Sequence, residues 1–170
     1  MPVRDETWYE RVIEALNRAG AEYLIAGGMA LNLHGVSRLT KDLDLYFDWG
    51  PENVRKIVRT LGALGFKLRQ PIDPELLADP KERERLRAEK NVKAFTFILP
   101  DNPYEVIDLL LVNDPPFREC ASRVVRLRSG TVPVVSIPDL IRMKKEASRS
   151  QDLLDIRALE RILELQKERK

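Results

Sequence analysis

The sequence has very little cysteine, no long apolar run and almost no net charge. A single cysteine, Cys120, excludes a disulfide-stabilised scaffold and a four-thiolate zinc site, and is typical of proteins from a reducing compartment. No apolar stretch approaches the ~20 residues of a membrane-spanning helix, and residues 1–9 are too polar for a secretion signal. These absences predict a cytoplasmic protein with no membrane partner.

The charge is small in sum but unevenly distributed. Lys and Arg total 29 against 27 Asp and Glu. Residues 1–122 hold 17 basic and 20 acidic side chains, whereas residues 123–170 hold 12 basic and 7 acidic. The four Tyr and five Phe are not interleaved with the basic residues, as a stacking platform for nucleic acid requires. The basic C-terminal part therefore suits a phosphate-bearing ligand, and nucleic-acid binding as the sole role is disfavoured.

The length and composition predict a globular protein. With 170 residues, 44% of them hydrophobic and 33% charged, we expect one domain over residues 1–170, with C-terminal helices at 136–170 packed on it. Apolar spacing and capping residues predict helices over 6–18, 29–33, 51–64, 136–147 and 150–170. Strands are expected over 23–26, 42–48 and 66–69, with a hairpin over 92–99/104–112. Residues 122–127 and 131–135 form either a second hairpin or a strand followed by an extended segment, and the highly charged segment 74–90 predicts a solvated helix. This mixture indicates an α/β or α+β fold, a mixed β-sheet flanked by helices.

Three aspartates are the candidate catalytic residues. Asp42 and Asp44 are two residues apart on a predicted strand, so they share one face with Cα atoms about 7 Å apart. Such a pair repels itself unless a proton or cation lies between, and hard oxygen ligands suit Mg²⁺ or Mn²⁺. Asp108 interrupts an apolar run, where burial alone does not explain a charge. If its strand neighbours that of Asp42, the three carboxylates converge and can hold two metal ions for phosphoryl transfer.

A glycine pair precedes these aspartates. Gly27 and Gly28 lie between a short buried strand and a helix, and without Cβ atoms they let the backbone approach a ligand. A helix that begins there directs free N–H groups at phosphates. Each feature alone is weak, because a lone D-x-D is commonly an exposed strand pair and a glycine pair is commonly a turn. The joint pattern is more specific.

The segment 24–45 resembles the nucleotidyltransferase superfamily of the DNA polymerase β type. It is most similar to the minimal prokaryotic branch of AbiEii-type toxin proteins, in which a glycine pair, an Ala, a His-Gly, an Arg and D-x-D occur in this order. The resemblance continues over 134–144 with Asp-x4-Lys and over 147–156 with Lys/Arg-x-x-Asp-x-x-Asp. Residues 66–92 have no counterpart.

The resemblance implies Mg²⁺-dependent transfer of a nucleoside monophosphate from an NTP to a hydroxyl acceptor. In this role Asp42, Asp44 and Asp108 are the catalytic residues and metal ligands, holding two Mg²⁺ ions with Mn²⁺ as the alternative. Asp108 also helps the acceptor hydroxyl lose its proton. Acceptors in such families include RNA such as tRNA ends, proteins and small molecules, and a toxin role would add an antitoxin protein as a partner.

The nucleotide side of the site is also implied by the resemblance. Gly27 and Gly28 would cradle the triphosphate, and Lys144 would neutralise its charge. Many relatives have Ser at the position of Gly28, so affinity for the triphosphate must here come from backbone N–H groups. Arg149 would contact phosphate or RNA, while Arg38 either reaches a phosphate, braces the aspartates or lies in solvent.

Several polar residues keep two interpretations. Asp139 is either a first-turn partner of the helix dipole or a functional residue. Asp152 and Asp155 are either functional or hold basic side chains such as Arg149 in place. His34, the only histidine, is expected to be a hydrogen-bonded structural residue.

The sequence allows two functions other than nucleotide transfer to be compared with it. A catalytically weak nucleotide- or metal-binding module that acts through a protein partner is supported by Gly28 and by the lack of an RNA-binding extension. A glycosyltransferase that uses D-x-D with Mn²⁺ is disfavoured, because 170 residues leave little space for donor and acceptor subsites.

Overall fold

The computed structural model describes residues 7–111, 114–128, 130–147 and 149–170, without the side chain of Lys90. The expected helix start at Glu6, strand end at Val112 and turn residue Ser129 lie outside these residues.

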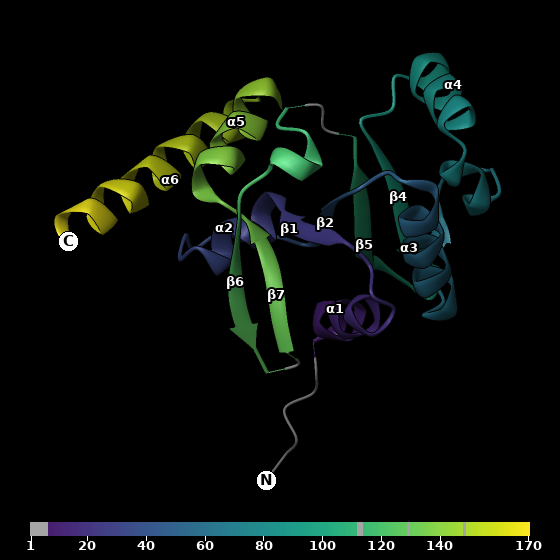
Figure 1. The fold of residues 1–170 in the computed structure, drawn as a ribbon, viewed down its shortest axis with the longest axis horizontal. Helices are drawn as coiled ribbons and strands as arrows, with labels where there is room; N and C mark the ends of the chain where they lie inside the picture. Colours follow the sequence, from purple (N-terminus) through teal and green to yellow (C-terminus); the bar gives the residue numbers. More distant parts are fainter. Residues whose placement is uncertain (1–6, 112–113, 129, 148) are drawn as a thin grey trace, which may run out of the picture.

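Seven strands form one mixed sheet (Figure 1). The strands are β1 (Tyr23–Ala26), β2 (Asp42–Phe47), β3 (Lys67–Leu68), β4 (Ala94–Leu99), β5 (Asn102–Leu110), β6 (Ser122–Leu127) and β7 (Gly130–Val135). Their order in the sheet is β3-β4-β5-β2-β1-β7-β6. The pairs β1–β7 and β2–β5 are parallel and the others antiparallel, including the two predicted hairpins.

Helices flank this sheet, which confirms the predicted fold class. They are α1 (Trp8–Arg18), α2 (Gly27–Leu33), α3 (Pro51–Ala63), α4 (Pro80–Lys90), α5 (Ile137–Ala147) and α6 (Ser150–Glu168), with short 3-10 turns η1 (Pro74–Ala78) and η2 (Phe117–Glu119). Among the described residues, no helix combines the length and apolar character that crossing a membrane requires.

The position of the hydrophobic core shows which face of the sheet is free to carry a functional site. Side chains alternate between the two faces of a strand. In β2, β4 and β5 the alternate residues Leu43, Leu45, Phe95, Phe97, Ile107 and Leu109 are buried in one core with α1 and α3. Asp42, Asp44 and Asp108 therefore project from the opposite face.

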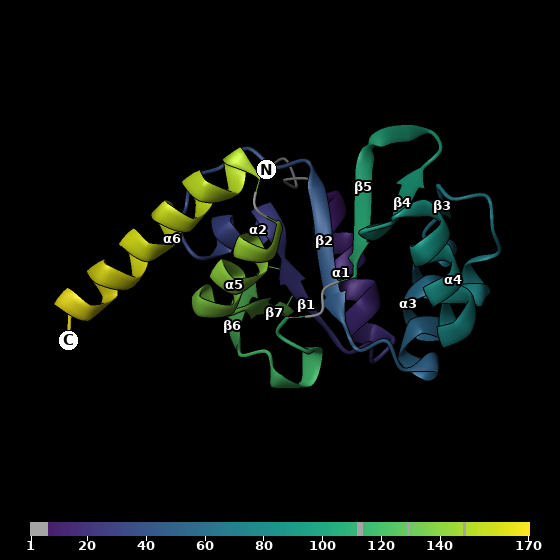
Figure 2. The same ribbon diagram turned by 90° about the horizontal axis from the view of Figure 1, so that it is seen from above.

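The last two helices pack against each other and join the core. Ile137 and Leu140 of α5 and Ile156 and Leu159 of α6 belong to the same buried core. In Figures 1 and 2 the C-terminal part of α6 extends away from the body, at the end of the molecule opposite α3 and α4. The expectation of one domain over residues 1–170 stays a prediction.

Two local expectations need correction. Helix α2 begins at Gly27, two residues earlier than expected, because Ala26 is already its N-cap. The charged segment is not one helix, because Asp79 ends η1 and then caps α4 by accepting a hydrogen bond from the N–H of Lys81 at 2.9 Å. Helix α4 ends where Asn91 adopts a left-handed conformation with φ 48°.

Candidate functional site

The three aspartates meet on the open sheet face. The parallel pairing of β2 and β5 puts Asp44 directly opposite Asp108, and Asp42 lies two residues earlier on the same face of β2. Neighbouring strands are about 4.8 Å apart. Asp42 is exposed, while Asp44 and Asp108 are half-buried. Strands β2 and β5 are therefore neighbours, which is the condition on which the expected convergence of the three carboxylates depended.

Burial and mutual repulsion make these carboxylates weaker acids. Burial, followed by the charges of Asp108 and Asp42, raises the pKa of Asp44 to about 7. Burial also raises the pKa of Asp108, against a hydrogen bond at 2.6 Å that the Thr96 hydroxyl donates to Asp108 Oδ1. A proton or a cation near Asp44 would relieve this repulsion.

The donor chemistry fits a divalent cation, although the ligands are not preassembled. Within the described residues, no three His, Cys, Asp or Glu side chains are grouped as a metal site. Asp42, Asp44 and Asp108 still supply carboxylate oxygens, which Mg²⁺ prefers. Burial is the main cause of the raised pKa of Asp44, and the repulsion from Asp108 and Asp42 that adds to it would be relieved by a cation.

The two glycines play different structural parts. Gly27 has φ +60°, and a Cβ atom there would lie 1.7 Å from Asp44 Oδ2, so only glycine leaves room for this carboxylate. Gly28 is buried, and a Cβ atom there would lie 2.8 Å from Thr40 Oγ1. Gly27 borders a cavity over Asp44 and Asp108, whereas Gly28 is not one of the residues that line it.

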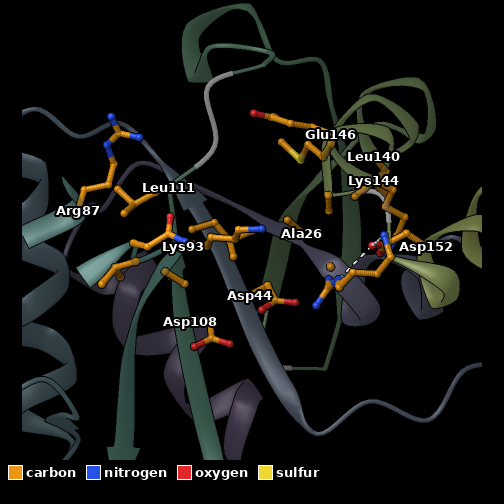
Figure 3. A pocket seen from close by; sticks show the side chains of 18 residues that line it. Ala26, Asp44, Arg87, Lys93, Asp108, Leu111, Leu140, Lys144, Glu146 and Asp152 are labelled. Atoms are coloured by element: carbon orange, nitrogen blue, oxygen red, sulfur yellow. Dashed lines mark hydrogen bonds and ion pairs between the residues drawn. The ribbon is translucent and has the colours of Figure 1, made fainter. Parts of the chain in front are cut away.

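A cavity of about 490 Å³ lies over Asp44 and Asp108. In Figure 3 these two side chains stand on adjacent strands, with Arg87 and Lys93 on one side and Lys144 and Asp152 on the other. The α4–β4 wall consists of Arg87, Asn91, Val92, Lys93 and Ala94. The wall formed by α5 and α6 consists of Leu140, Met143, Lys144, Glu146, Ala147, Arg149 and Asp152.

An ion-pair cluster with a buried centre formed by Lys144, Asp152 and Asp155 supports the second wall. Lys144 is 8% exposed, and its Nζ lies 2.7 Å from Asp155 Oδ2 and 3.4 Å from Asp152 Oδ1. Arg149 Nε lies 3.0 Å from Asp152 Oδ2, and Arg38 pairs with Asp155. We call these five residues the α5–α6 charge cluster. Its three cations and two carboxylates leave one excess positive charge beside Asp44.

The cluster shows how the predicted basic residues are held. Asp152 and Asp155 bind basic side chains, which was one of the two interpretations offered by the sequence. Lys144 and Arg149 also border the cavity, whereas Arg38 does not and contacts Asp155 instead. The charges of Lys144 and Arg149 act to lower the pKa of Asp44, against the larger effect of burial.

Two other singled-out residues are structural. The imidazole of His34 is buried with Nε2 2.8 Å from the carbonyl oxygen of Val135, as expected for a hydrogen-bonded histidine. Asp139 is buried and accepts a hydrogen bond from the N–H of Ala121 at 2.7 Å, which ties α5 to the segment before β6.

Sequence reasoning missed the α4–β4 wall. The composition of residues 74–90 indicated only a solvated helix, and the outer side chains do form exposed pairs such as Arg85–Glu82. Lys93 reaches the site because its carbonyl accepts a hydrogen bond from the N–H of Leu111 at 3.1 Å, next to the end of β5. No local sequence signal reports that contact.

The fold is similar to that of solved nucleotidyltransferases. ANT(2'')-Ia in complex with adenylyl-2''-tobramycin is 16% identical, covering 94% of this chain and 89% of its own, with a TM-score of 0.60. The lincomycin-bound lincosamide antibiotic adenylyltransferase LnuA is 15% identical over 94% of this chain and 99% of its own, with a TM-score of 0.57. An antigenic nucleotidyltransferase-like protein from Paracoccidioides brasiliensis is 15% identical over 92% of this chain and 75% of its own, with a TM-score of 0.56.

These likenesses establish the nucleotidyltransferase fold that the sequence resemblance implied. No protein-family model matches the sequence, and a search of curated proteins gives no match.

Proposed function

We propose that this chain is a divalent-cation-dependent nucleotidyltransferase that moves a nucleoside monophosphate from an NTP to a hydroxyl acceptor and releases pyrophosphate. The observation that carries the proposal is the pair Asp44–Asp108, which faces a cavity of about 490 Å³ bordered by Lys144 and Arg149. The nucleotidyltransferase fold of the chain supports the same reaction class.

The carboxylates divide the chemistry between them. Asp42, Asp44 and Asp108 would hold two Mg²⁺ or Mn²⁺ ions, whose contribution is to neutralise phosphate charge and activate the acceptor hydroxyl. We assign the proton of the acceptor to Oδ2 of Asp108, because Oδ1 already accepts a hydrogen bond from the Thr96 hydroxyl.

The phosphates lie toward α5 and α6. Lys144 and Arg149 border the cavity and provide positive charge for the triphosphate and the departing pyrophosphate. Gly27 leaves room for Asp44 and for the nearby phosphate, and Gly28 acts by letting Thr40 pack closely. Arg38 acts through Asp155, which also holds Lys144.

The finer assignment is to the AbiEii-like branch. It is supported by the order of the glycine pair, His34, Arg38 and the D-x-D aspartates along the chain. A toxin of this branch would work in the cytoplasm with an antitoxin protein as its partner.

A label-transfer experiment tests the proposal. The purified chain is incubated with Mg²⁺ and each of the four NTPs labelled at the α-phosphate, together with cellular RNA, protein or small molecules in separate reactions. We expect label on one acceptor fraction with the wild type and none with Asp44→Asn, whereas label at the γ-phosphate leaves with pyrophosphate. NTP binding without transfer would instead indicate the binding module, and transfer of the γ-label would contradict the reaction class.

A further inference from the structure

We propose that the acceptor carries a phosphate group beside its reacting hydroxyl and that Lys93 binds this phosphate. The inference rests on the proposed function and narrows its acceptor class. It comes from the order of charged groups across the sheet and from the chemistry of the α4–β4 wall.

The charged groups follow the strand order. Lys93 directly precedes β4, Asp108 is on the next strand, β5, and Asp44 is on β2. Gly27 follows β1, and Lys144 belongs to the helix that follows β7. On β4 the residue opposite Asp108 is Thr96, and Lys93 lies three residues before it, opposite Leu111. The cavity over the aspartate pair is therefore bordered by positive charge on two sides, with Lys93 on the β4 side and the α5–α6 charge cluster on the β7 side.

The reaction geometry assigns these two sides to different substrates. In phosphoryl transfer the attacking and leaving oxygens are roughly in line with the phosphorus between them. The acceptor oxygen forms a bond to the α-phosphorus, the bond from that phosphorus to the oxygen bridging to the β-phosphate breaks, and the hydroxyl proton passes to Asp108. Because the pyrophosphate leaves toward Lys144 and Arg149, the acceptor approaches from the β5–β4 side, where Lys93 lies.

The α4–β4 wall is positively charged. Its cavity-lining residues include two cations, Arg87 and Lys93, and none of the five is a carboxylate. Arg87 is already paired with Glu84 through two hydrogen bonds of 2.8 and 2.9 Å. The wall therefore disfavours an acceptor with several positive charges.

Lys93 is the cation on this wall with no other partner. Its side chain is exposed and extends into the cavity (Figure 3). In the portion of the chain that the structure describes, its ammonium makes no hydrogen bond or ion pair. Lys144, by contrast, is buried between Asp152 and Asp155. A lysine ammonium binds phosphate as a compact point charge, so Lys93 suits a phosphate of the second substrate.

The test uses the full chain with α-labelled NTP and two kinds of acceptor. A cell extract is separated on an anion exchanger into retained and unretained fractions, and tobramycin serves as a polycationic hydroxyl probe. Wild type is compared with Lys93→Ala and with Lys81→Ala, which removes an exposed lysine at the other end of α4, away from the cavity. Ribonuclease treatment of the retained fraction distinguishes RNA from a small phosphate compound.

We expect label only in the retained fraction. Lys93→Ala should raise the half-saturating acceptor concentration about tenfold or more, because the loss of a hydrogen bond to a charged group has an effect of that size. The same variant should leave the KM for NTP within about twofold of the wild-type value. Lys81→Ala should change neither. Label on the unretained fraction or on tobramycin, or an effect of Lys93→Ala on the NTP alone, overturns this inference and leaves the proposed function standing. A wild type that transfers no label overturns both.

Discussion

Asp44 is the residue on which the geometry of the site most depends. It lies opposite Asp108 on the neighbouring strand and fills the space that the missing Cβ of Gly27 leaves free. Its carboxyl group is surrounded by two other carboxylates and by the positive charges of Lys144 and Arg149. Its protonation and metal binding should therefore be linked to the stability of the fold.

Stability should depend on pH through Asp44. Its pKa in the folded chain, about 7, lies above the ordinary value of 3.8, so folding favours the protonated form. Without metal, this stabilisation is complete below the ordinary pKa and is lost as the pH rises through about 7. Mg²⁺ should replace the proton, so it should raise the midpoint of urea unfolding more at about pH 8 than at about pH 5. An equal effect of Mg²⁺ on Asp44→Asn would contradict metal binding at this residue.

Gly27→Ala should disable the site while Gly20→Ala does not. Both glycines have positive φ, +60° and +67°, so the backbone strain of alanine alone should cost about 1 kcal/mol of stability at either position. Only at position 27 does the new Cβ meet Asp44, whereas nothing lies within 4 Å of a Cβ at position 20. Turnover should fall about a hundredfold or more in Gly27→Ala, since small displacements of reacting groups have effects of that size. Equal turnover in the two variants would remove the assigned role of Gly27.

At the scale of elements, the site combines segments that are distant in the sequence. Alternating residues over 42–48 predicted β2 and put Asp42 and Asp44 on one face, because that pattern is local. Asp108 was found because a charge inside an apolar run is unusual. That β5 lies beside β2 required the structure, since strand order depends on pairings between distant residues.

The positions of the basic residues were also only partly predictable from the sequence. The sequence resemblance singled out Lys144, but its burial between Asp152 and Asp155 depends on how α5 packs against α6. The sequence did not indicate that Lys93 and Arg87 lie at the site, because the composition of a charged helix is the same whether or not its end borders a cavity. Local patterns thus predicted the elements, and the packing of elements decided which charges reach the site.

Asp155→Asn should weaken both the fold and NTP binding. The substitution leaves Lys144 and Arg38 without a charged partner at Asp155, and breaking a buried pair in this way costs about 3 kcal/mol or more. Glu164→Gln is the control on the same helix, since it breaks the exposed Arg161–Glu164 pair and should change stability by less than about 1 kcal/mol. Urea unfolding gives the stability, and equilibrium titration with each NTP gives the affinity. Similar values for the two variants would show that the α5–α6 charge cluster is not needed.

At the scale of the whole molecule, we expect residues 1–170 to behave as one domain. The N-terminal half of α6 shares the core with α5, whereas its C-terminal part projects from the body (Figure 2). Trp8 and Trp49 report on α1 and on the turn between β2 and α3, while far-UV circular dichroism reports on all helices. If residues 1–170 are one cooperative unit, urea unfolding should give coincident transitions by both probes. A separate loss of helix signal would show that some helices unfold independently of the part of the chain that holds the two tryptophans.

The central claim is that the carboxylates facing the cavity transfer a nucleotide, and the turnover of Asp44→Asn tests it most directly. Pyrophosphate release and transfer of α-label should be measured together for the wild type, for Asp44→Asn and for Asp101→Asn, which changes an exposed turn residue. We predict equal amounts of pyrophosphate and transferred label in the wild type and in Asp101→Asn, and a loss of at least several hundredfold in Asp44→Asn, since a metal ligand is removed without a change in volume. Unchanged turnover in a folded Asp44→Asn variant would contradict the account.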